Sequence, residues 1–399
     1  MPDSCDSAHA FRASHLLIRT FSAKSNVAEH GKMSSSAAEP KQTIGSVQAK
    51  LAFSSKAWLS AFGPAFFLRN GHAQTLAGNF WRRKPFADTA TAEPVTVDSD
   101  GSRVLCHCHW QPQELRASRL TLLLVHGLEG SSNSRYMLGI TRLAWQAGCN
   151  VIRMNMRNCG GTESWTPTLY HSGMSSDVHA VLRFFVAREG LKQVGMIGYS
   201  MGGNLVMKLA GELADDAPEW LAGVVGVSPA MDLAASADAL HMPANRFYEW
   251  HFLRNLMKRF HRKAALFPER YTGLPQGPVR SVREFDDKIT APCSGFADAD
   301  DYYERASSAR VVSQLRIPAL ILHALDDPFI RMLPETRKAI LDNSAIRLIE
   351  TSHGGHCAFL AAKPMTHGAD EHSRHWAEHT AVRFLLALRR DDREPADGS

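Results

Sequence analysis

The sequence predicts an α/β fold, a mostly parallel sheet with helices on both faces and an inserted segment. Three observations predict it. From residue 120 onward, short β-branched or apolar runs alternate with longer segments of helical periodicity, which is typical of parallel strands joined by helices. Each run ends in a polar or glycine-rich loop. The alternation stops between residues 231 and 310, a stretch far longer than an ordinary connection.

Six strands follow from these runs, and we expect them at residues 120–125, 150–154, 193–197, 222–227, 319–323 and 345–349. The helices between and after them are expected at residues 133–147, 176–188, 202–213 and 372–389. The stretches around Val95 and Leu105 resemble an antiparallel leading edge. Because ligands of open parallel sheets bind outside the carboxyl ends of the strands, we expect the chemistry in the loops that follow them.

The domain organisation predicted from this pattern is one core interrupted by one insertion. Residues 1–48 form an N-terminal extension without sustained periodicity, which we expect to be largely disordered. The core is expected at residues 49–230 and 311–390, with a cap over the active site at residues 231–310 and a flexible tail at residues 391–399.

The composition is that of a soluble globular protein, with 399 residues, 44% hydrophobic and 21% charged. The net charge of +5 comes from basic residues that alternate with acids along the chain, so no nucleic-acid partner is implied. No apolar run approaches the roughly eighteen residues of a membrane span. The seven cysteines lack framework spacing, and several, such as Cys149 and Cys357, lie in apolar runs. We therefore expect reduced, buried thiols and a cytoplasmic location.

The sharpest motif is a hydrophobic strand that runs through Gly-Tyr-Ser-Met-Gly at residues 198–202 into a helix. Such a turn between strand and helix is so tight that side chains larger than those of Gly198 and Gly202 would collide with their neighbours. Its effect is to project the serine hydroxyl at the mouth of the sheet. The pattern therefore predicts Ser200 as a nucleophile.

A serine hydroxyl needs a base to remove its proton as it attacks. After the last strand, His353 and His356 compete, and we favour His356 because the two preceding glycines let its loop bend back toward Ser200. A carboxylate at the end of the preceding strand should hold the imidazole tautomer. Asp326 and Asp327 follow that strand, and we favour Asp327 because Pro-Phe follows it, an apolar pair that packs the loop.

Negative charge on the attacked carbonyl oxygen requires preorganised donors, usually backbone N–H groups. Met201 follows Ser200 directly, and Leu128 lies in a His-Gly-Leu-Glu-Gly loop that closes the strand at residues 120–125. We expect the N–H groups of Leu128 and Met201 to form this oxyanion hole. His126 is interpreted as a packing residue beneath it.

With these residues assembled, the chain resembles the YheT-like branch of the α/β-hydrolase family. Beyond the Ser-Asp-His set, it contains the His-x-Gln-Thr element at residues 72–75 and an Asn-x-Arg loop at residues 155–161. Signatures also match at residues 170–173 with Asp177, and within the insertion at residues 285–287, 290, 295–296, 302–303 and 307. The resemblance covers roughly residues 66–388. Two departures are Asn158 in place of a glycine and Cys357-Ala358 in place of leucine-glycine.

The resemblance implies an α/β-hydrolase fold and hydrolysis of carboxylic esters, with lipid-like or medium-chain acyl substrates, and the proposed chemistry requires no metal or organic cofactor. Two alternatives stay open: an acyltransferase or thioesterase on the same three residues, and a non-catalytic fold that binds a lipid or partner. The expected partner is a small-molecule acyl ester. The sequence makes no prediction of oligomeric state.

Two further segments have compositions typical of a binding site. Cys106-His107-Cys108-His109 has a metal-like composition, but a strand would separate its cysteines from its histidines, so we predict no zinc site. Residues 247–260, aromatic and then basic, are interpreted as a cap helix that lines an acyl pocket, touches an anionic membrane peripherally or simply packs on the core.

Overall fold

The structure, a computed structural model, describes residues 57–81, 83, 86, 89–275, 277–365 and 373–389. The predicted N-terminal extension at residues 1–48 and the tail at residues 391–399 lie outside the described residues.

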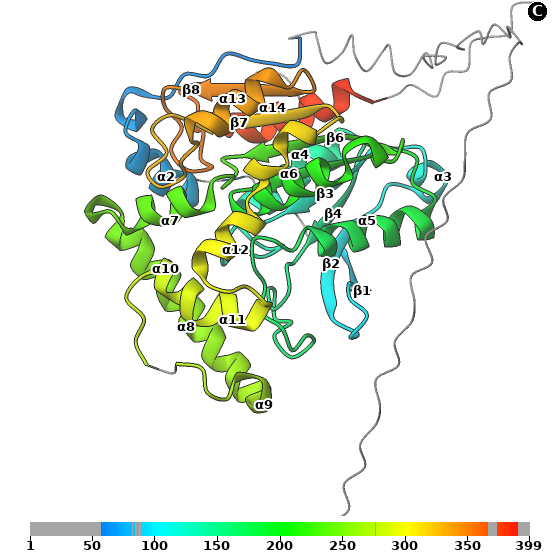
Figure 1. Ribbon diagram of the computed structural model, residues 1–399. Coiled ribbons are helices and arrows are strands. Elements are labelled where there is room, and N and C mark those ends of the chain that lie inside the picture. Colours follow the sequence, from blue (N-terminus) through cyan, green and yellow to red (C-terminus); the bar gives the residue numbers. More distant parts are fainter. Residues whose placement is uncertain are drawn as a thin grey trace, which may run out of the picture. The chain divides into compact units, whose positions relative to one another are not determined.

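The centre of the fold is an eight-stranded sheet with the order β1-β2-β4-β3-β5-β6-β7-β8 (Figure 1). Its strands are β1 (Thr91–Thr96), β2 (Arg103–His109), β3 (Thr121–Val125), β4 (Asn150–Met154), β5 (Val194–Tyr199), β6 (Leu221–Val227), β7 (Ala319–Ala324) and β8 (Ile346–Thr351). Strands β1 and β2 run antiparallel, and β3 to β8 pair in parallel. The predicted α/β fold is therefore confirmed, with the leading edge and all six parallel strands shifted by no more than two residues at either end.

Helices cover both faces because alternate side chains of each buried strand point to opposite sides. Leu123 belongs to an apolar cluster with α5 (Ser175–Glu189), α6 (Met201–Leu213) and α13 (Pro334–Asp342). Its neighbour Leu122 belongs to a second cluster, with α4 (Arg135–Gln146) and α14 (Trp376–Ala387). Both leucines are fully buried. The sheet is thus the middle layer of three.

The chain between β6 and β7 is helical, and we call residues 231–310 the helical insertion. It contains α7 (Leu233–His241), α8 (Arg246–Leu266), α9 (Pro268–Tyr271), α10 (Val282–Phe285), a π-helical turn (Asp286–Thr290), α11 (Ala291–Ser294) and α12 (Ala299–Ala306). Figure 1 shows these elements together on one side of the sheet. They have a separate apolar cluster that also includes Phe329 and Ile330, which follow β7. The insertion therefore packs on loops at the carboxyl ends of the strands.

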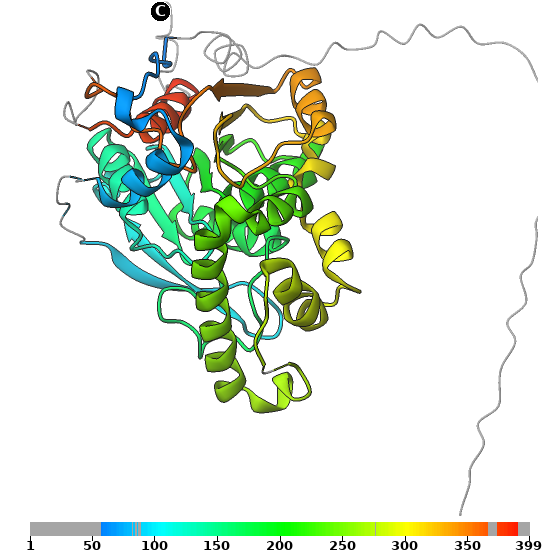
Figure 2. The ribbon, with the colours of Figure 1, turned by 90° about the vertical axis from the view of Figure 1, so that its left-hand side faces the viewer.

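Two short helices precede the parallel strands, α2 (Gly71–Phe80) and α3 (Gln113–Arg116). In α2, the Asn70 side chain caps the helix by accepting hydrogen bonds from the N–H groups of His72 and Ala73. His72 stacks on Tyr248 near the start of α8, with ring centroids 5.7 Å apart. Figure 2 shows α8 extending away from this point. The single-turn 3₁₀ helices are Phe66–Leu68, Ala214–Asp216, Pro243–Asn245, Ser308–Arg310 and Val312–Gln314.

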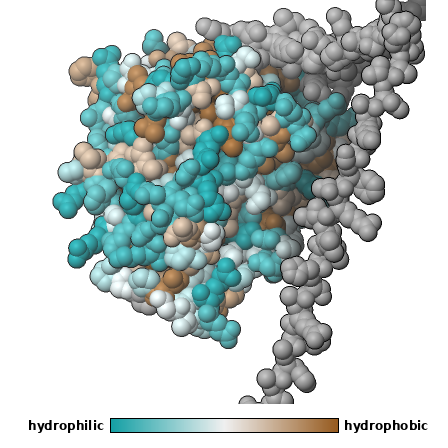
Figure 3. All heavy atoms as spheres, viewed as in Figure 1, coloured by the Kyte–Doolittle hydropathy of each residue, from teal (hydrophilic) through white to brown (hydrophobic). Residues whose placement is uncertain are grey.

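On the face of the molecule seen in Figure 3, hydrophilic side chains predominate and hydrophobic ones are scattered. None of the helices in the described part of the chain is long and apolar enough to span a membrane. The six described cysteines are free, and four of them are buried. The prediction of buried thiols is confirmed for Cys149 but wrong for Cys357, which is partly exposed because its loop faces a cavity described below.

Candidate active site

Ser200 lies at the junction of β5 and α6, in the tight turn that the motif predicts. Its φ of 54° lies in the left-handed region, which is strained for a residue other than glycine. A Cβ atom at Gly198 would lie 2.1 Å from the carbonyl oxygen of Gly202, and one at Gly202 would lie 2.3 Å from the carbonyl oxygen of His126. Only glycine fits at either position, so the backbone itself raises Ser200 at the carboxyl end of the central strand.

The two carboxylates after β7 have different partners. Asp327 is buried, and its Oδ2 atom lies 2.9 Å from Nδ1 of His356. Its Oδ1 atom accepts hydrogen bonds from the N–H groups of Phe329 and Ile330. Asp326 instead accepts a 2.9 Å hydrogen bond from the N–H of Gly355. Asp327 is therefore the carboxylate that orients His356, while Asp326 holds the loop that carries it.

Electrostatics favour an ionised Asp327 beside a basic His356. Burial opposes ionisation of Asp327, but the charge and hydrogen bond of His356 outweigh it and lower the pKa of the carboxyl group. Burial likewise opposes the imidazolium form of His356. The Cys357 side chain and Asp327 outweigh that effect and raise the pKa of His356. The raised pKa makes this imidazole a stronger base.

Ser200 and His356 line the same cavity without a direct bond between them. We call it the His356 cavity, and Cys357, Tyr248 and Phe252 line it as well. Among the described residues, the Ser200 hydroxyl makes no hydrogen bond, and the Nε2 atom of His356 lies 3.7 Å from the Cys357 sulfur. Catalytic hydrogen bonds are often long before substrate binds and tighten in the complex.

The loop after β3 lies against Ser200. A Cβ atom at Gly127 would lie 3.2 Å from the Cβ atom of Ser200. Leu128 and Met201 line a second cavity together with Ser200. Within the described part of the chain, no hydrogen bond uses the N–H group of Leu128 or of Met201, so both donors are available to a ligand.

His126 is buried and holds this loop in place. Its Nε2 atom accepts a 3.1 Å hydrogen bond from the N–H of Met156, and its Nδ1 atom lies 2.8 Å from the Gly127 oxygen. Because the amide leaves Nε2 without a proton, Nδ1 carries it. Burial lowers the pKa of His126 to about 4. It is a neutral packing residue, as the sequence predicts.

The same loop is tied to the helical insertion through Glu129. The guanidinium group of Arg259 in α8 binds both oxygens of Glu129, at 3.0 and 3.2 Å. The Tyr170 hydroxyl donates a 2.6 Å hydrogen bond to Glu129, and the Tyr170 ring lies below the same guanidinium group. Arg259 also donates to the carbonyl oxygen of Asn158. The insertion therefore braces the loop that carries Leu128.

Sequence reasoning missed what the His-x-Gln-Thr element does. Gln74 exchanges two hydrogen bonds with the backbone of Leu360, of 3.1 and 3.0 Å. The Thr75 hydroxyl accepts a 2.9 Å hydrogen bond from the N–H of His356. Helix α2 thus holds the loop at His356 and again at Leu360. No local pattern could reveal contacts between residues 281 positions apart.

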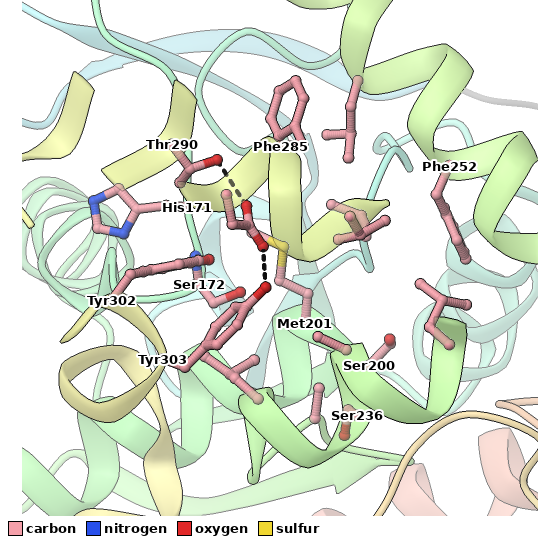
Figure 4. A pocket seen from close by; sticks show the side chains of 18 of the residues that line it. His171, Ser172, Ser200, Met201, Ser236, Phe252, Phe285, Thr290, Tyr302 and Tyr303 are labelled. Carbon is pink, nitrogen blue, oxygen red and sulfur yellow. Dashed lines mark hydrogen bonds between the residues drawn. The ribbon is translucent and has the colours of Figure 1, made fainter. Parts of the chain in front are cut away.

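The second cavity, which we call the apolar cavity, extends from Ser200 under the insertion. Its apolar walls come from both parts of the fold and include Leu128, Leu233, Phe252, Leu256 and Phe329. Figure 4 shows Ser200 and Phe252 on one side and His171, Tyr302 and Tyr303 on the other. Ser200 therefore lies between two cavities, one apolar and one that also contains His356.

Two further sets of residues named from the sequence have structural roles outside the site. Cys106 and Cys108 pack in the cluster beneath α5 and α6, whereas His107 binds Ser132, so β2 separates them as predicted. In the described residues, no group of three or more His, Cys, Asp or Glu side chains could hold a metal ion. Asp177 forms a buried, two-pronged ion pair with Arg157, with both distances 2.7 Å.

Comparison with known proteins decides the family. A family model described as alpha/beta hydrolase fold matches residues 121–362. The chain belongs to the α/β-hydrolase family. It is 31% identical over 322 residues to the YheT protein of Escherichia coli (strain K12), covering 79% of this chain and 90% of that protein. The resemblance to a YheT-like hydrolase noted in the sequence is thereby confirmed.

Other α/β-hydrolases similar to this chain are named for ester-cleaving activities. Monoacylglycerol lipase of Saccharomyces cerevisiae (strain ATCC 204508 / S288c) is 28% identical, covering 66% of this chain and 58% of that protein. Human phospholipase ABHD3 is 26% identical, covering 74% of this chain and 73% of that protein. The solved Pyrococcus furiosus esterase Pf2001 has 15% identity and a TM-score of 0.44, covering 69% of this chain and 87% of that one. The yeast and human relatives support a hydrolase of the esterase and lipase kind.

Proposed function

We propose that this α/β-hydrolase cleaves carboxylic esters of acyl or lipid-like substrates, with Ser200, His356 and Asp327 as its catalytic triad. The observation that carries the proposal is the shared cavity: Ser200 on its strained turn and His356, oriented by Asp327, line the same space. The meeting of these groups from distant parts of the chain supports their assignment to one triad.

In the proposed reaction, the Ser200 oxygen bonds to the ester carbonyl carbon while His356 Nε2 accepts the hydroxyl proton. The N–H groups of Leu128 and Met201 stabilise the negative oxygen of the tetrahedral intermediate. The C–O bond to the alcohol then breaks, and His356 returns the proton to the leaving oxygen. Water repeats the sequence on the acyl-enzyme, which releases the acid and restores Ser200.

The division of substrate between the two cavities follows from their linings. The apolar cavity suits an acyl chain because more than half of its lining residues are apolar, with leucine and phenylalanine prominent among them. The His356 cavity suits the alcohol portion, since the group that protonates the leaving oxygen lies there. The helical insertion, which supplies most of the apolar lining, would act as the cap predicted at residues 231–310.

Hydrolysis of p-nitrophenyl esters of increasing acyl length tests this function. The wild type should turn over short and medium chains, and Ser200→Ala should abolish turnover. A fluorophosphonate probe should label the wild type and leave Ser200→Ala unlabelled. Thermal melting of both proteins controls for folding. Undiminished turnover in a folded Ser200→Ala protein, or no labelling of the wild type, would refute the proposal.

Acyl transfer to an alcohol is the second candidate. One relative, 25% identical over 301 residues, is named medium-chain fatty acid ethyl ester synthase/esterase 2 of Saccharomyces cerevisiae (strain ATCC 204508 / S288c). An alcohol in place of water would attack the same acyl-enzyme. Turnover of a p-nitrophenyl ester in ethanol-containing buffer, with the ethyl ester and free acid separated and counted, distinguishes the two. A ratio well above the molar ratio of ethanol to water would favour transfer.

Peripheral contact with an anionic membrane is part of the proposal, through α8. Phe247 and Trp250 are 63% and 56% exposed at the start of this helix, and Phe247 lines the His356 cavity. Arg254 and Lys258 follow one and two turns later and are exposed as well. Aromatic side chains beside a basic stripe suit a lipid surface. The cytoplasmic location stays a prediction.

A further inference from the structure

One end of the apolar cavity is polar, and neither the triad nor the oxyanion hole uses it. His171, Ser172, Tyr302, Tyr303 and Asp286 line it, in the part of Figure 4 away from Phe252. Ser172 and Tyr302 are 5% and 4% exposed. A purely alkyl chain would leave such buried polar groups without partners.

Two hydrogen-bond donors at this end, on Tyr302 and His171, have no protein acceptor among the described residues. The side chain of Ser172 is hydrogen-bonded to the Tyr302 hydroxyl group. The Tyr302 oxygen accepts a 2.9 Å bond from the N–H of Ser172, while its own proton has no acceptor among those residues. His171 Nδ1 accepts a 3.1 Å bond from the N–H of Gly173, so Nε2 carries the proton and can donate. The end therefore offers donors to a ligand oxygen.

The charges around this end favour a neutral oxygen. The carboxylate of Asp286 accepts hydrogen bonds from the Thr290 and Tyr303 hydroxyls, both at 2.7 Å. Its negative charge would repel an anion. Arg259, the basic residue of the lining, is already engaged by Glu129. Burial lowers the pKa of His171 to about 4, so its ring is neutral near pH 7. A ketone or hydroxyl oxygen fits this environment better than a carboxylate.

The polar end lies close to the nucleophile. Asn204 donates its backbone N–H to the carbonyl oxygen of Ser200 at 3.0 Å and its side-chain N–H to the carbonyl oxygen of Ser172 at 2.9 Å. One turn of helix, about 5.4 Å, therefore joins Ser200 to the segment that carries the donors. An acyl chain attached to Ser200 would reach it within a few carbon atoms.

We propose that Tyr302, held by Ser172, and His171 bind a neutral carbonyl or hydroxyl oxygen on the acyl chain, so that the enzyme selects oxygenated acyl groups over alkyl groups of equal length. This selectivity rests on the proposed ester hydrolysis and names the substrate class of the same site. It makes the far wall of the cavity a specificity element.

The test compares p-nitrophenyl hexanoate and octanoate with the same chains carrying a ketone at the penultimate carbon. In the wild type, kcat/KM for a keto ester should exceed that for its alkyl counterpart by about fivefold or more. Tyr302→Phe should reduce this ratio about fivefold because it removes a donor and little volume. Ser172→Ala should also reduce the ratio, because it removes the side chain that is hydrogen-bonded to Tyr302. Ser236→Ala, a serine of the same cavity on α7, is the matched control and should leave the ratio unchanged.

Two readouts keep failure of this inference separate from failure of the hydrolase function. Calorimetry of Ser200→Ala with 7-oxooctanoate and octanoate measures selectivity without turnover, and the oxo acid should bind more tightly. Because Tyr302→Phe leaves a buried N–H unpaired, Ser172→Ala and thermal melting control for misfolding. Each of the following results would overturn the inference while leaving ester hydrolysis intact. They are a ratio of one in the wild type, ratios unaffected by Ser172→Ala and Tyr302→Phe, an equal effect of Ser236→Ala, and equal affinities in calorimetry.

Discussion

Adjacent carboxylates at positions 326 and 327 have different tasks because the loop after β7 turns between them. Asp327 reaches His356, and Asp326 reaches the backbone of Gly355. Both are carboxylates of equal size at neighbouring positions, so each serves as the control for the other. The two side chains have different partners because the backbone directs each of them to a different place.

Asp327→Asn should lower kcat for ester hydrolysis by about 10⁴-fold, because an amide stabilises neither the tautomer nor the charge of His356. Asp326→Asn should lower it by less than about tenfold, since an amide oxygen still accepts the Gly355 N–H. Steady-state kinetics of both variants checks this. Equal losses would show that the orienting carboxylate is wrongly assigned.

The pH dependence should reflect the raised pKa of His356. Only the neutral imidazole accepts the Ser200 proton, so activity falls as the pH drops through this pKa. Because Cys357 and Asp327 raise the pKa of His356, the acidic limb of kcat/KM should have its midpoint above the ordinary histidine value of about 6.5. Cys357→Leu removes one of these influences and should move the midpoint to lower pH. A midpoint below 6.5 in the wild type, or an upward shift in the variant, would contradict this.

At the scale of elements, helix α2 positions a loop that is distant in sequence. Thr75 and Gln74 bind the backbone at and after His356. The helix begins at Gly71, which lets it approach the backbone of Asp326 closely. A Cβ atom at Gly71 would lie 1.9 Å from the backbone carbonyl oxygen of Asp326. His356 is therefore held by a helix as well as by Asp327.

Thr75→Val should lower kcat by about tenfold to a hundredfold, because the His356 N–H loses its acceptor and the imidazole shifts. Stability should fall by about 1–3 kcal/mol through the same unpaired donor. Thr75→Ser keeps the hydroxyl and should retain most activity. The comparison needs kinetics and urea denaturation of both variants, and a Thr75→Ser protein as impaired as Thr75→Val would point to packing instead.

Helix α8 and the loop after β3 are coupled through Arg259 and Glu129, whose side chains are 14% and 9% exposed. Arg259→Met leaves the carboxylate without its partner and should reduce the free energy of unfolding by about 3 kcal/mol. Glu129→Gln with Arg259→Met should cost less than the sum of the single changes. Urea denaturation of all four proteins measures the coupling, and strict additivity would show that the contact contributes nothing.

For the whole molecule, the exposed face of α8 should govern association with lipid. Vesicles containing anionic lipid should bind the wild type. Arg254→Ala with Lys258→Ala should weaken binding about thirtyfold, at about 1 kcal/mol per basic residue. Arg183→Ala with Lys192→Ala, which removes two exposed bases outside α8, should have little effect. Equal weakening by both pairs, or no dependence on anionic lipid in cosedimentation, would exclude a specific α8 contact.

The sequence by itself determined the sheet, because strand periodicity and glycine-rich turns are local properties of the chain. It also located Ser200 in the turn between strand and helix, since the clash that forces glycine at position 198 is with Gly202, four residues away. Choosing His356 used chain order and the two glycines before it, and choosing Asp327 used the Pro-Phe pair after it. These choices could be made because a parallel sheet brings the carboxyl ends of its strands together.

Only the tertiary structure decided how Thr75 holds His356, how Arg259 braces Glu129, and that Cys357 faces a cavity instead of the core. These contacts join residues between 129 and 281 positions apart, and their energies depend on packing that no sequence window contains. The polar end of the apolar cavity has the same origin, since Ser172 and Tyr302 meet only when the insertion folds back over the sheet.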